Sequence, residues 1–371
     1  MKIVCEREHL LSAFQTAALV SPTRSPKPIL RNVKFDSTEG SLVLMATDLE
    51  VGIRIEVPQV EVLERGSIVL PTAQLGPILK EMIDERLTID ADPQRIIIQG
   101  DRSRFVLPAQ NADEFPNVLG FEEQGYFEIP ARLLRELIRR TLFAADVESA
   151  RYALGGVLLE FQPERMIAVA TDGRRLAKME APCQEVGTRE ADDMMTIVPS
   201  RAMQLIERAL GDPDSIVHVS ARRNDVLVRS DRATIYSRLV EGRFPRWRDV
   251  LPQRQDSVQI DVIVGPLYSA LRQASIVTDD ESRGIDFEFQ EGSLVLTAAT
   301  NQIGQSRVEF PIAYSGSPVK ITLDHRFVAD FLRVLEPEKT VSLDIQNNEA
   351  AALFTTDDGY GYVVMPLARE A

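Results

Sequence analysis

The segment "VATDGRRLAKME", residues 169–180, holds a Thr-Asp-Gly turn followed by two arginines. Two other segments carry nearly the same turn, "MATDLEVGIR" at residues 45–54 and "AATNQIGQSR" at residues 298–307. The threonines of the three turns are 124 and 129 residues apart. A period of this size is the length of a domain and far exceeds that of a solenoid repeat. The chain is therefore predicted to contain three copies of one domain.

Other landmarks repeat with the same period. The segment "RSRFVLPAQNADEFPNV", residues 102–118, resembles "TIYSRLVEGRFPRWRDV", residues 234–250, and the Phe-Pro pair at 115–116 matches the pair at 244–245, 129 residues later. The chain closes with "GYGYVVMPLAREA", residues 359–371, at the equivalent place of the third copy. Stretches without periodicity then separate the copies and place domain boundaries near 1–122, 123–253 and 254–371.

Each copy contains two helical segments between short alternating runs. Leucine and isoleucine recur at helical spacing in residues 130–145, which predicts an amphipathic helix, and related segments occur at 7–20 and 265–277. A second helix in each copy is predicted to begin at an N-cap residue, namely Thr72, Ser200 and Asp324. Runs such as "SLVLMATD", "RIIIQG" and "SLVLTAAT" predict antiparallel strands. The expected fold class is α+β.

Composition narrows the setting of the protein. The chain has 371 residues, and no apolar run approaches the roughly 18 residues of a membrane span. Its N-terminus shows no secretory signal, and Cys5 and Cys183 lack the spacing of a disulfide framework or a metal site. We therefore expect a cytoplasmic protein without a metal. The formal charge of −14 argues against a nucleic-acid partner unless the basic residues are gathered on one surface.

Four strings occur in a specific order along the chain: "EREHLL", "ATDGRRLA", "LVEGRFPRWRDVLP" and "YVVMPL". In these strings, and over its whole length, the chain resembles the bacterial DNA polymerase III beta subunit, the sliding clamp. The resemblance implies three tandem DNA-clamp domains, each with two helices packed on antiparallel sheets. It also implies a head-to-tail homodimer that closes a ring of six domains around duplex DNA.

The resemblance implies a non-catalytic processivity factor without a cofactor. Its implied partners are double-stranded DNA bound without sequence preference, the DNA polymerase III alpha subunit, the clamp loader, and other polymerases and repair proteins that carry clamp-binding peptides. No membrane partner is implied. An adaptor of the same fold that never encircles DNA is an alternative, although basic helices count against it.

Basic residues recur on the polar sides of the predicted helices, as DNA contacts would require. Arg132, Arg135 and Arg139 lie at positions i, i+3 and i+7 of one helix, off its leucine stripe. Arg201 and Arg208 repeat this spacing, as do Arg326 and Arg333, and Lys80 and Arg272 lie on further helices. Any surface helix can carry arginine, but recurrence in several helices favours a basic surface. Together with positions that the resemblance implies, the predicted DNA-binding residues are Arg24, Lys80, Arg132, Arg135, Arg139, Arg140, Arg151, Tyr152, Arg201 and Arg208.

The resemblance also implies a peptide-binding cleft and a dimer interface. The cleft lies between the second and third domains and would consist of Leu154, Thr171, Gly173, Arg174, Arg175, Leu176, Pro245, Val250, Phe327, Val363, Met365, Pro366 and Leu367. Ile78, Phe105, Leu107, Ile276 and Val277 match interface positions, although each fits a core position equally well. The Ala368–Ala371 tail, which follows "YVVMPL", departs from many relatives.

A hydrolase on a triplicated β scaffold, with Asp172 and Arg175 in its active site, is the alternative from another functional class. Such a site needs a second acid, a histidine or a metal near Asp172. The three histidines of the chain, His9, His218 and His325, do not occupy matching positions in the copies. Local hydrogen bonds from Thr and Asp side chains explain the repeated turn better, and only the middle copy adds the Gly-Arg-Arg-Leu sequence of the implied cleft.

Overall fold

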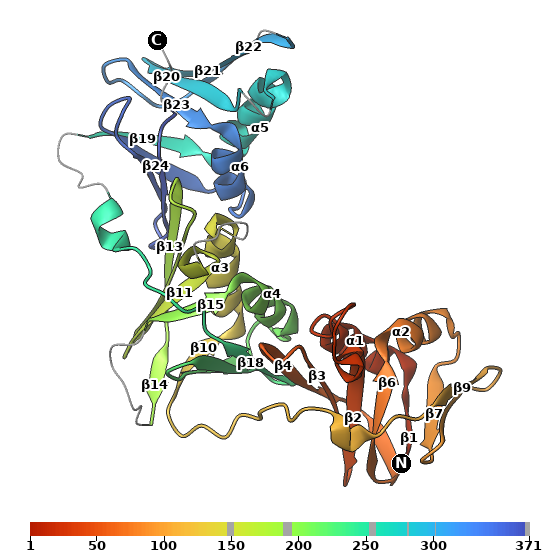
Figure 1. The fold of residues 1–371 in the computed structure, drawn as a ribbon. Helices are drawn as coiled ribbons and strands as arrows, with labels where there is room; N and C mark the ends of the chain where they lie inside the picture. Colours follow the sequence, from red (N-terminus) through yellow and green to blue (C-terminus); the bar gives the residue numbers. More distant parts are fainter. Residues whose placement is uncertain (147–151, 188–194, 252–256, 280–281, 301, 368–371) are drawn as a thin grey trace. The chain divides into compact units, whose positions relative to one another are not determined.

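The structure is a computed structural model that describes residues 1–146, 152–187, 195–251, 257–279, 282–300 and 302–367, with only the backbone of Tyr152. The chain forms two compact units, each drawn in Figure 1. Unit 1 comprises Met1–Arg135, Gln162–Glu164 and Pro182–Val240, and unit 2 comprises Glu136–Phe161, Arg165–Ala181 and Glu241–Ala371. No helix in the described ranges is long and apolar enough to cross a membrane.

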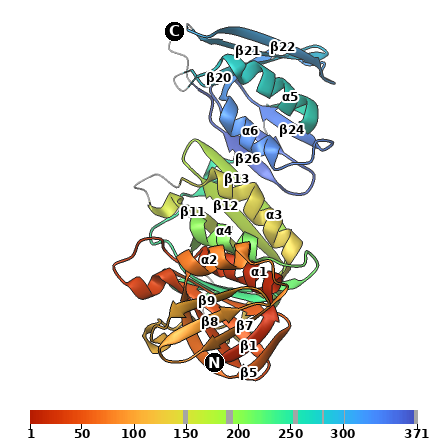
Figure 2. The same ribbon diagram turned by 90° about the vertical axis from the view of Figure 1, so that its right-hand side faces the viewer.

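Unit 1 contains two antiparallel sheets, with the strand orders β5-β1-β7-β8-β9 and β14-β10-β16-β17-β18-β4-β3-β2-β6. Helices α1 (Arg7–Ala18) and α2 (Thr72–Glu81) lie side by side (Figures 1 and 2), and α4 spans Ser200–Ala209. The remaining elements of this unit are β1 (Lys2–Glu6), η1 (Pro28–Arg31), β2 (Asn32–Thr38), β3 (Ser41–Thr47), β4 (Val51–Val57), β5 (Val60–Glu64), β6 (Gly66–Pro71), β7 (Arg86–Ala91), β8 (Arg95–Gln99), β9 (Arg104–Pro108), η2 (Ala112–Glu114), β10 (Tyr126–Pro130), β14 (Gln184–Val186), β15 (Thr196–Pro199), β16 (Ile216–Ala221), β17 (Asp225–Arg229) and β18 (Ala233–Arg238).

Unit 2 contains the strand run β11-β12-β13-β26-β25-β24-β19 and a sheet with the order β22-β21-β20-β23. Helices α5 (Val264–Ala274) and α6 (His325–Arg333) lie side by side, and α3 (Ala131–Thr141) leads from unit 1 into unit 2. The remaining elements are η3 (Leu142–Ala144), η4 (Tyr152–Leu154), β11 (Gly156–Gln162), β12 (Arg165–Thr171), β13 (Arg175–Pro182), η5 (Trp247–Val250), β19 (Val258–Ile263), η6 (Ser275–Val277), β20 (Gly284–Gln290), β21 (Ser293–Thr300), β22 (Gly304–Pro311), β23 (Val319–Asp324), β24 (Thr340–Ile345), β25 (Ala352–Thr355) and β26 (Gly361–Val364).

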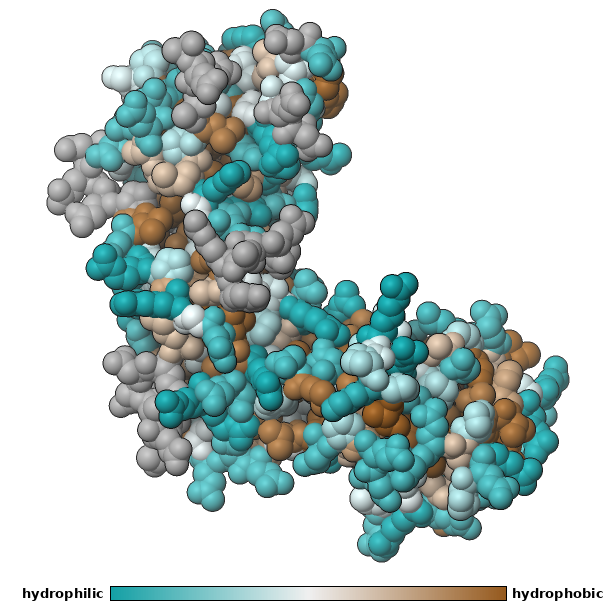
Figure 3. All heavy atoms as spheres, viewed as in Figure 1, coloured by the Kyte–Doolittle hydropathy of each residue, from teal (hydrophilic) through white to brown (hydrophobic). Residues whose placement is uncertain are grey.

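Burial follows the periodicity of the sequence. In α3, Leu134, Leu137 and Ile138 are buried, whereas Arg132 and Arg139 on the opposite side are exposed. Burial of each such side chain contributes roughly 1.5–3 kcal/mol, so the apolar stripe fixes which face of the helix meets the sheet. The prediction of an α+β fold is confirmed. On the face seen in Figure 3, hydrophilic side chains predominate and apolar residues appear in separate patches.

The predicted helix starts are partly wrong. Thr72 and Ser200 are the first residues of α2 and α4, and the prolines before them occupy the cap position without a side-chain hydrogen bond. Strands β6 and β15 run directly into these helices, so the last strand residue takes the cap position. The Thr72 hydroxyl donates instead to the carbonyl of Arg31, at 2.9 Å. Asp324 is an N-cap as predicted, since its Oδ1 accepts from the backbone N–H of Arg326 at 3.0 Å.

The repeated turn is held by its Thr and Asp side chains, as predicted. In the first copy, Thr47 Oγ1 donates to the carbonyl of Val51 at 2.8 Å and accepts from the N–H of Leu49 at 2.9 Å. Asp48 Oδ1 accepts from the N–H groups of Glu50 and Val51. Each side chain therefore satisfies backbone groups that the change of chain direction would leave unpaired.

The middle copy forms the same bonds. Thr171 Oγ1 donates to the carbonyl of Arg175 at 2.6 Å and accepts from the N–H of Gly173 at 3.0 Å. Gly173 has a φ of +88°, and Leu49 at the same place in the first copy has +82°. Because glycine adopts this conformation without steric cost, the middle turn is less strained than the first. In the third copy Thr300 Oγ1 accepts from the N–H of Ile303, and Asn301 lies outside the described residues.

Candidate functional site

The middle turn lies beside the last strand of unit 2. Strand β13 pairs antiparallel with β26, with Arg175 opposite Val364 and Leu176 opposite Val363. The pairing extends beyond β26, because the N–H of Met365 donates to the carbonyl of Arg174 at 2.9 Å. A segment of the second sequence copy and the end of the third copy are therefore neighbours in one continuous sheet.

The predicted cleft residues divide into a buried base and an accessible surface. Leu154, Thr171, Leu176 and Val363 are buried. Gly173, Arg174, Pro245, Val250 and Met365 are exposed, with 43% of Val250 and 45% of Met365 accessible. Phe327, Pro366 and Leu367 are half-buried. An apolar base with exposed Val and Met beside exposed backbone has the composition of a site for apolar peptide side chains.

The Arg175 side chain is held in place by contacts with several residues of unit 2. Its Nε lies 2.9 Å from Asp172 Oδ2, its Nη1 lies 2.7 Å from Asp330 Oδ2, and its Nη2 donates to the carbonyl of Phe143 at 2.8 Å. The guanidinium also lies over the ring of Phe327, 4.4 Å from its centroid. All three nitrogens are thus engaged inside the protein, and Arg175 holds α6 and η3 against β13.

The surroundings of Arg175 keep it charged. Burial acts to lower its pKa, but the neighbouring Tyr362, Asp330 and Asp172 outweigh burial and raise the pKa above its usual value. Arg174, the next residue along the turn, is exposed. Of the two arginines in the middle turn, Arg174 is therefore the one whose side chain is accessible to a ligand.

Arg140 corrects one prediction. We expected it on the DNA-facing side of α3, but only 5% of the residue is exposed. Its Nη1 contacts Asp358 Oδ2 at 2.7 Å, its Nη2 contacts Glu136 Oε1 at 2.6 Å, and its guanidinium lies over the ring of Tyr360. Arg140 follows Arg139 by one residue, which turns it about 100° around the helix and towards the protein interior. It is not accessible to DNA.

The other predicted DNA contacts lie in more than one environment. Arg24, Lys80, Arg132, Arg139, Arg201 and Arg208 are exposed. Arg135 is half-buried and donates to the carbonyl of Leu210 at 2.7 Å, whereas Arg201 pairs with Asp48 at 2.6 Å. Arg151 and the side chain of Tyr152 lie outside the described residues. Arg132 is exposed as well, although its Nε lies 3.8 Å from Asp214 Oδ1.

Comparison with known proteins identifies the family. Models of the DNA polymerase III beta subunit match the chain in three consecutive parts: the N-terminal domain over residues 1–119, the central domain over 128–246 and the C-terminal domain over 248–368. The chain belongs to the DNA polymerase III beta subunit family.

Individual relatives agree over the full length. The beta sliding clamp of Pseudomonas putida is 32% identical over 379 residues, which cover 99% of this chain and 100% of the relative. The crystal structure of the Pseudomonas aeruginosa sliding clamp bound to griselimycin is 29% identical, with a TM-score of 0.92 and complete coverage of both chains. The Bacillus subtilis clamp, at 22% identity and a TM-score of 0.92, shares the fold. The three tandem clamp domains expected from the sequence are confirmed.

The beta subunit family is one of non-catalytic clamps, so the hydrolase alternative has no support. The chemistry of the residues agrees with this. The Asp172 carboxylate already accepts from two backbone N–H groups and from Arg175. Burial raises the pKa of the Cys5 thiol to about 12, which makes it inert as a nucleophile. No group of acids, histidines and cysteines in the described ranges could hold a metal ion.

Four of the five predicted interface residues lie on or beside a strand at the edge of a sheet, and the fifth, Ile78, lies on α2. Phe105 and Leu107 belong to β9, and Ile276 and Val277 belong to η6, which packs against β22. Strands β9 and β22 are each the last in their sheet among the described residues. Ile276 is 74% exposed, and the other four predicted residues, including Ile78, are half-buried. Apolar residues beside an open strand edge are a typical feature of a surface that another chain covers.

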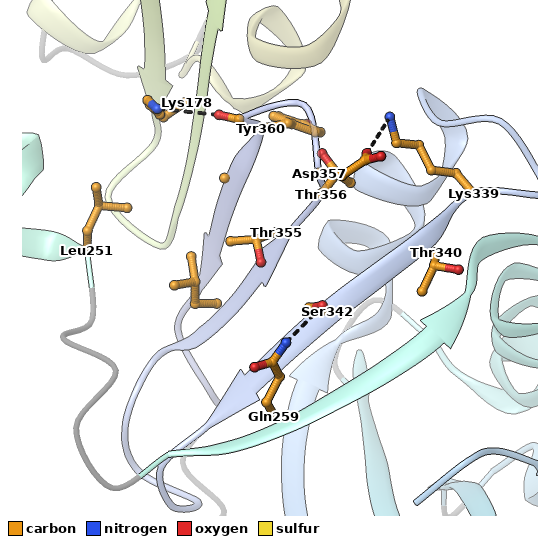
Figure 4. Close-up of a pocket in the computed structure, with 13 residues that line it drawn as sticks. Lys178, Leu251, Gln259, Lys339, Thr340, Ser342, Thr355, Thr356, Asp357 and Tyr360 are labelled. Carbon is orange, nitrogen blue, oxygen red and sulfur yellow. Dashed lines mark hydrogen bonds and ion pairs between the residues drawn. The ribbon is translucent and has the colours of Figure 1, made fainter.

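A separate hollow of about 740 Å³ lies over β19, β24, β25 and β26 (Figure 4). Its lysines have carboxylate partners: Lys178 Nζ lies 2.9 Å from Glu180 Oε2, and Lys339 Nζ lies 3.2 Å from Asp357 Oδ1. Gln259 and Ser342 are hydrogen-bonded to each other in its base. None of the predicted cleft residues lines this hollow, so it is a different feature from the cleft.

Proposed function

We propose that this chain is a DNA sliding clamp, a non-catalytic processivity factor of DNA polymerase III that acts in the cytoplasm. Two copies would close head to tail into a ring around duplex DNA, with domain boundaries near residues 122 and 253. The observation that carries the proposal is the match of three successive clamp-domain models along one chain, together with full-length similarity to sliding clamps.

The ring requires a second chain, and two features support that part of the proposal. The β9 and β22 edges carry accessible apolar residues nearby, of which Ile276 is the most exposed. A heterologous contact joins unlike edges of two copies, and it closes into a ring when the rotation between the copies allows it. Here two copies related by a twofold rotation, each with three domains, would close the ring. Pairing of the two edge strands would also cover their unpaired backbone groups, which otherwise favour aggregation.

DNA would be held by charge without sequence preference. The accessible cations Arg132 and Arg139 of α3 and Arg208 of α4 support this proposal, because arginine contacts to phosphates position a protein without reading bases. Because the net charge is −14, this proposal requires the excess of carboxylates to lie away from these helices. A closed ring needs only weak contacts to DNA, since topology keeps it on the duplex.

The cleft would bind short peptides of the DNA polymerase III alpha subunit, the clamp loader, and other polymerases and repair proteins. Its support is the arrangement of buried Leu176 and Val363 beside exposed Arg174 and Met365. Apolar peptide side chains would pack on Val and Met, and the exposed turn would meet the peptide backbone.

The experiment that tests the proposal is primer extension by DNA polymerase III and its loader on a singly primed circle. Addition of this chain should lengthen the products made in a single binding event. Products of unchanged length, with a loader that is active on its own clamp, would contradict the proposal.

A further inference from the structure

Pro245 and Val250 of the proposed cleft lie on one short segment, residues 245–250. Its last four residues form the short helix η5 (Trp247–Val250), and both cleft residues are exposed. Between them, Trp247 is 95% buried, and its backbone N–H donates to the carbonyl of Pro245 at 2.8 Å. The indole therefore anchors the segment to the body of unit 2.

One carboxylate receives the polar groups of this anchor. Glu160 Oε1, on β11, accepts from Trp247 Nε1 at 2.8 Å and from Arg248 Nη1 at 3.0 Å, and Glu160 Oε2 accepts from Arg248 Nη2 at 2.6 Å. The Arg248 guanidinium also lies over the Trp247 ring, 4.2 Å from its centroid. A bidentate arginine pair fixes orientation as well as distance.

The charge state of Glu160 supports the same arrangement. Burial acts to raise its pKa, but the hydrogen bonds from Arg248 and Trp247 outweigh burial and lower the pKa. Glu160 is therefore ionised at neutral pH. Both of its oxygens are used by residues that lie between Pro245 and Val250, so the position of this cleft wall depends on one side chain outside the cleft.

We infer that Glu160 is a positioning residue for the peptide cleft: through Trp247 and Arg248 it holds the segment that carries Pro245 and Val250. The inference rests on the proposed function of the cleft. Glu160 itself contacts no peptide. Loss of the Glu160 carboxylate would leave the Trp247 indole N–H without this acceptor and Arg248 without this ion-pair partner. The segment that carries Pro245 and Val250 would then no longer be held in one position.

The chain supplies its own reporter for a test, because Trp247 is its only tryptophan. We would titrate the DNA polymerase III alpha subunit against wild type, Glu160→Ala and Glu160→Gln, and record Trp247 emission of each free protein. Glu160→Ala should weaken alpha-subunit binding roughly tenfold and shift the emission to longer wavelength. Glu160→Gln keeps the side-chain volume and one acceptor oxygen, so its affinity should fall between the other two.

The matched control is Arg246→Ala, on the same segment, because the Arg246 side chain is 83% exposed and pairs with the exposed Asp249. It should bind like wild type. The inference would be overturned if Glu160→Ala shifted the Trp247 emission but left the affinity for the alpha subunit unchanged. It would also be overturned if Glu160→Ala changed neither the emission nor the affinity. Arg174→Ala and Met365→Ala separate the two proposals: if neither weakens binding of the alpha subunit, the cleft assignment itself fails.

Discussion

Arg140 Nη1 lies 2.7 Å from Asp358 Oδ2, and the two residues are 218 positions apart in the sequence. Arg140 comes from α3, within the central clamp domain, and Asp358 comes from the connection between β25 and β26, within the C-terminal domain. The Tyr360 hydroxyl donates to the carbonyl of Arg140 at 2.7 Å. A buried arginine thus joins two clamp domains inside unit 2.

Removal of this carboxylate should destabilise unit 2. Asp358→Asn would leave the Arg140 guanidinium buried with Glu136 as its remaining ion-pair partner. The expected loss is roughly 1–3 kcal/mol in the free energy of unfolding, because the buried Arg140 loses one charged acceptor while it keeps Glu136. Urea denaturation of wild type and variant measures it. Glu136→Gln is the control, since Glu136 is partly exposed and its pair should contribute less than about 1 kcal/mol. Equal effects of the two substitutions would contradict the account.

The pair of Arg140 and Asp358 predicts that the free energy of unfolding depends on pH. Burial acts to raise the pKa of Asp358, but hydrogen bonds from Lys339, Thr356 and Arg140 outweigh burial and hold the pKa well below its usual range. The folded protein therefore binds fewer protons here than the unfolded chain in acid. The stabilisation should be constant above about pH 5 and decline as the pH falls below about 4. The difference in unfolding free energy between wild type and Asp358→Asn should narrow in that range, and a difference that widens in acid would refute the assignment.

The cleft assignment predicts that substitutions in the cleft weaken binding of the alpha subunit without changing the assembly of the homodimer. Arg174→Ala and Met365→Ala should each weaken binding of the DNA polymerase III alpha subunit about tenfold, because both side chains are exposed beside the buried base. Neither should change the mass of the native assembly. Surface plasmon resonance and native mass spectrometry give the two readouts. Arg175→Ala should instead lower stability, since its partners Asp172 and Asp330 lie inside unit 2.

The basic helix surface predicts a salt effect. Replacement of Arg132, Arg139 and Arg208 by Ala should weaken binding to linear duplex DNA and flatten its dependence on salt, because each lost phosphate contact removes about 0.9 from the slope of log K against log salt. Arg135 is left in place, since it also bonds to the carbonyl of Leu210. Replacement of the exposed Arg86 and Arg165, which lie on strands, is the control. A slope unchanged by the helix substitutions would rule out the proposed surface.

Local features of the fold could be predicted from the sequence. The repeated turn was predictable because Thr171 and Asp172 bond to backbone groups within four residues of themselves. The helix in residues 130–145 was predictable from its apolar period. The burial of Arg140 was not, because its partner Asp358 is distant in sequence and nothing in the helix marks it.

The site was predictable to a smaller extent. Resemblance supplied the proposed cleft positions, but the sequence did not distinguish the exposed Arg174 from the partly buried Arg175 next to it. That distinction depends on Asp330 of α6, which only the folded chain brings to β13. Glu160 was missed for the same reason. The one available signal was the single tryptophan, whose indole N–H needs an acceptor when it is buried.

The central claim is that two copies of this chain encircle DNA, and retention on circular DNA tests it most directly. The protein is loaded onto a nicked circle by a clamp loader, separated from free protein by gel filtration, and the circle is then cut once. We predict that the protein remains on the intact circle in high salt and leaves after linearisation. An Ile276→Asp variant, with a charge at the proposed interface, should not be retained on either form. Equal retention of the wild type on circular and linear DNA would contradict the claim.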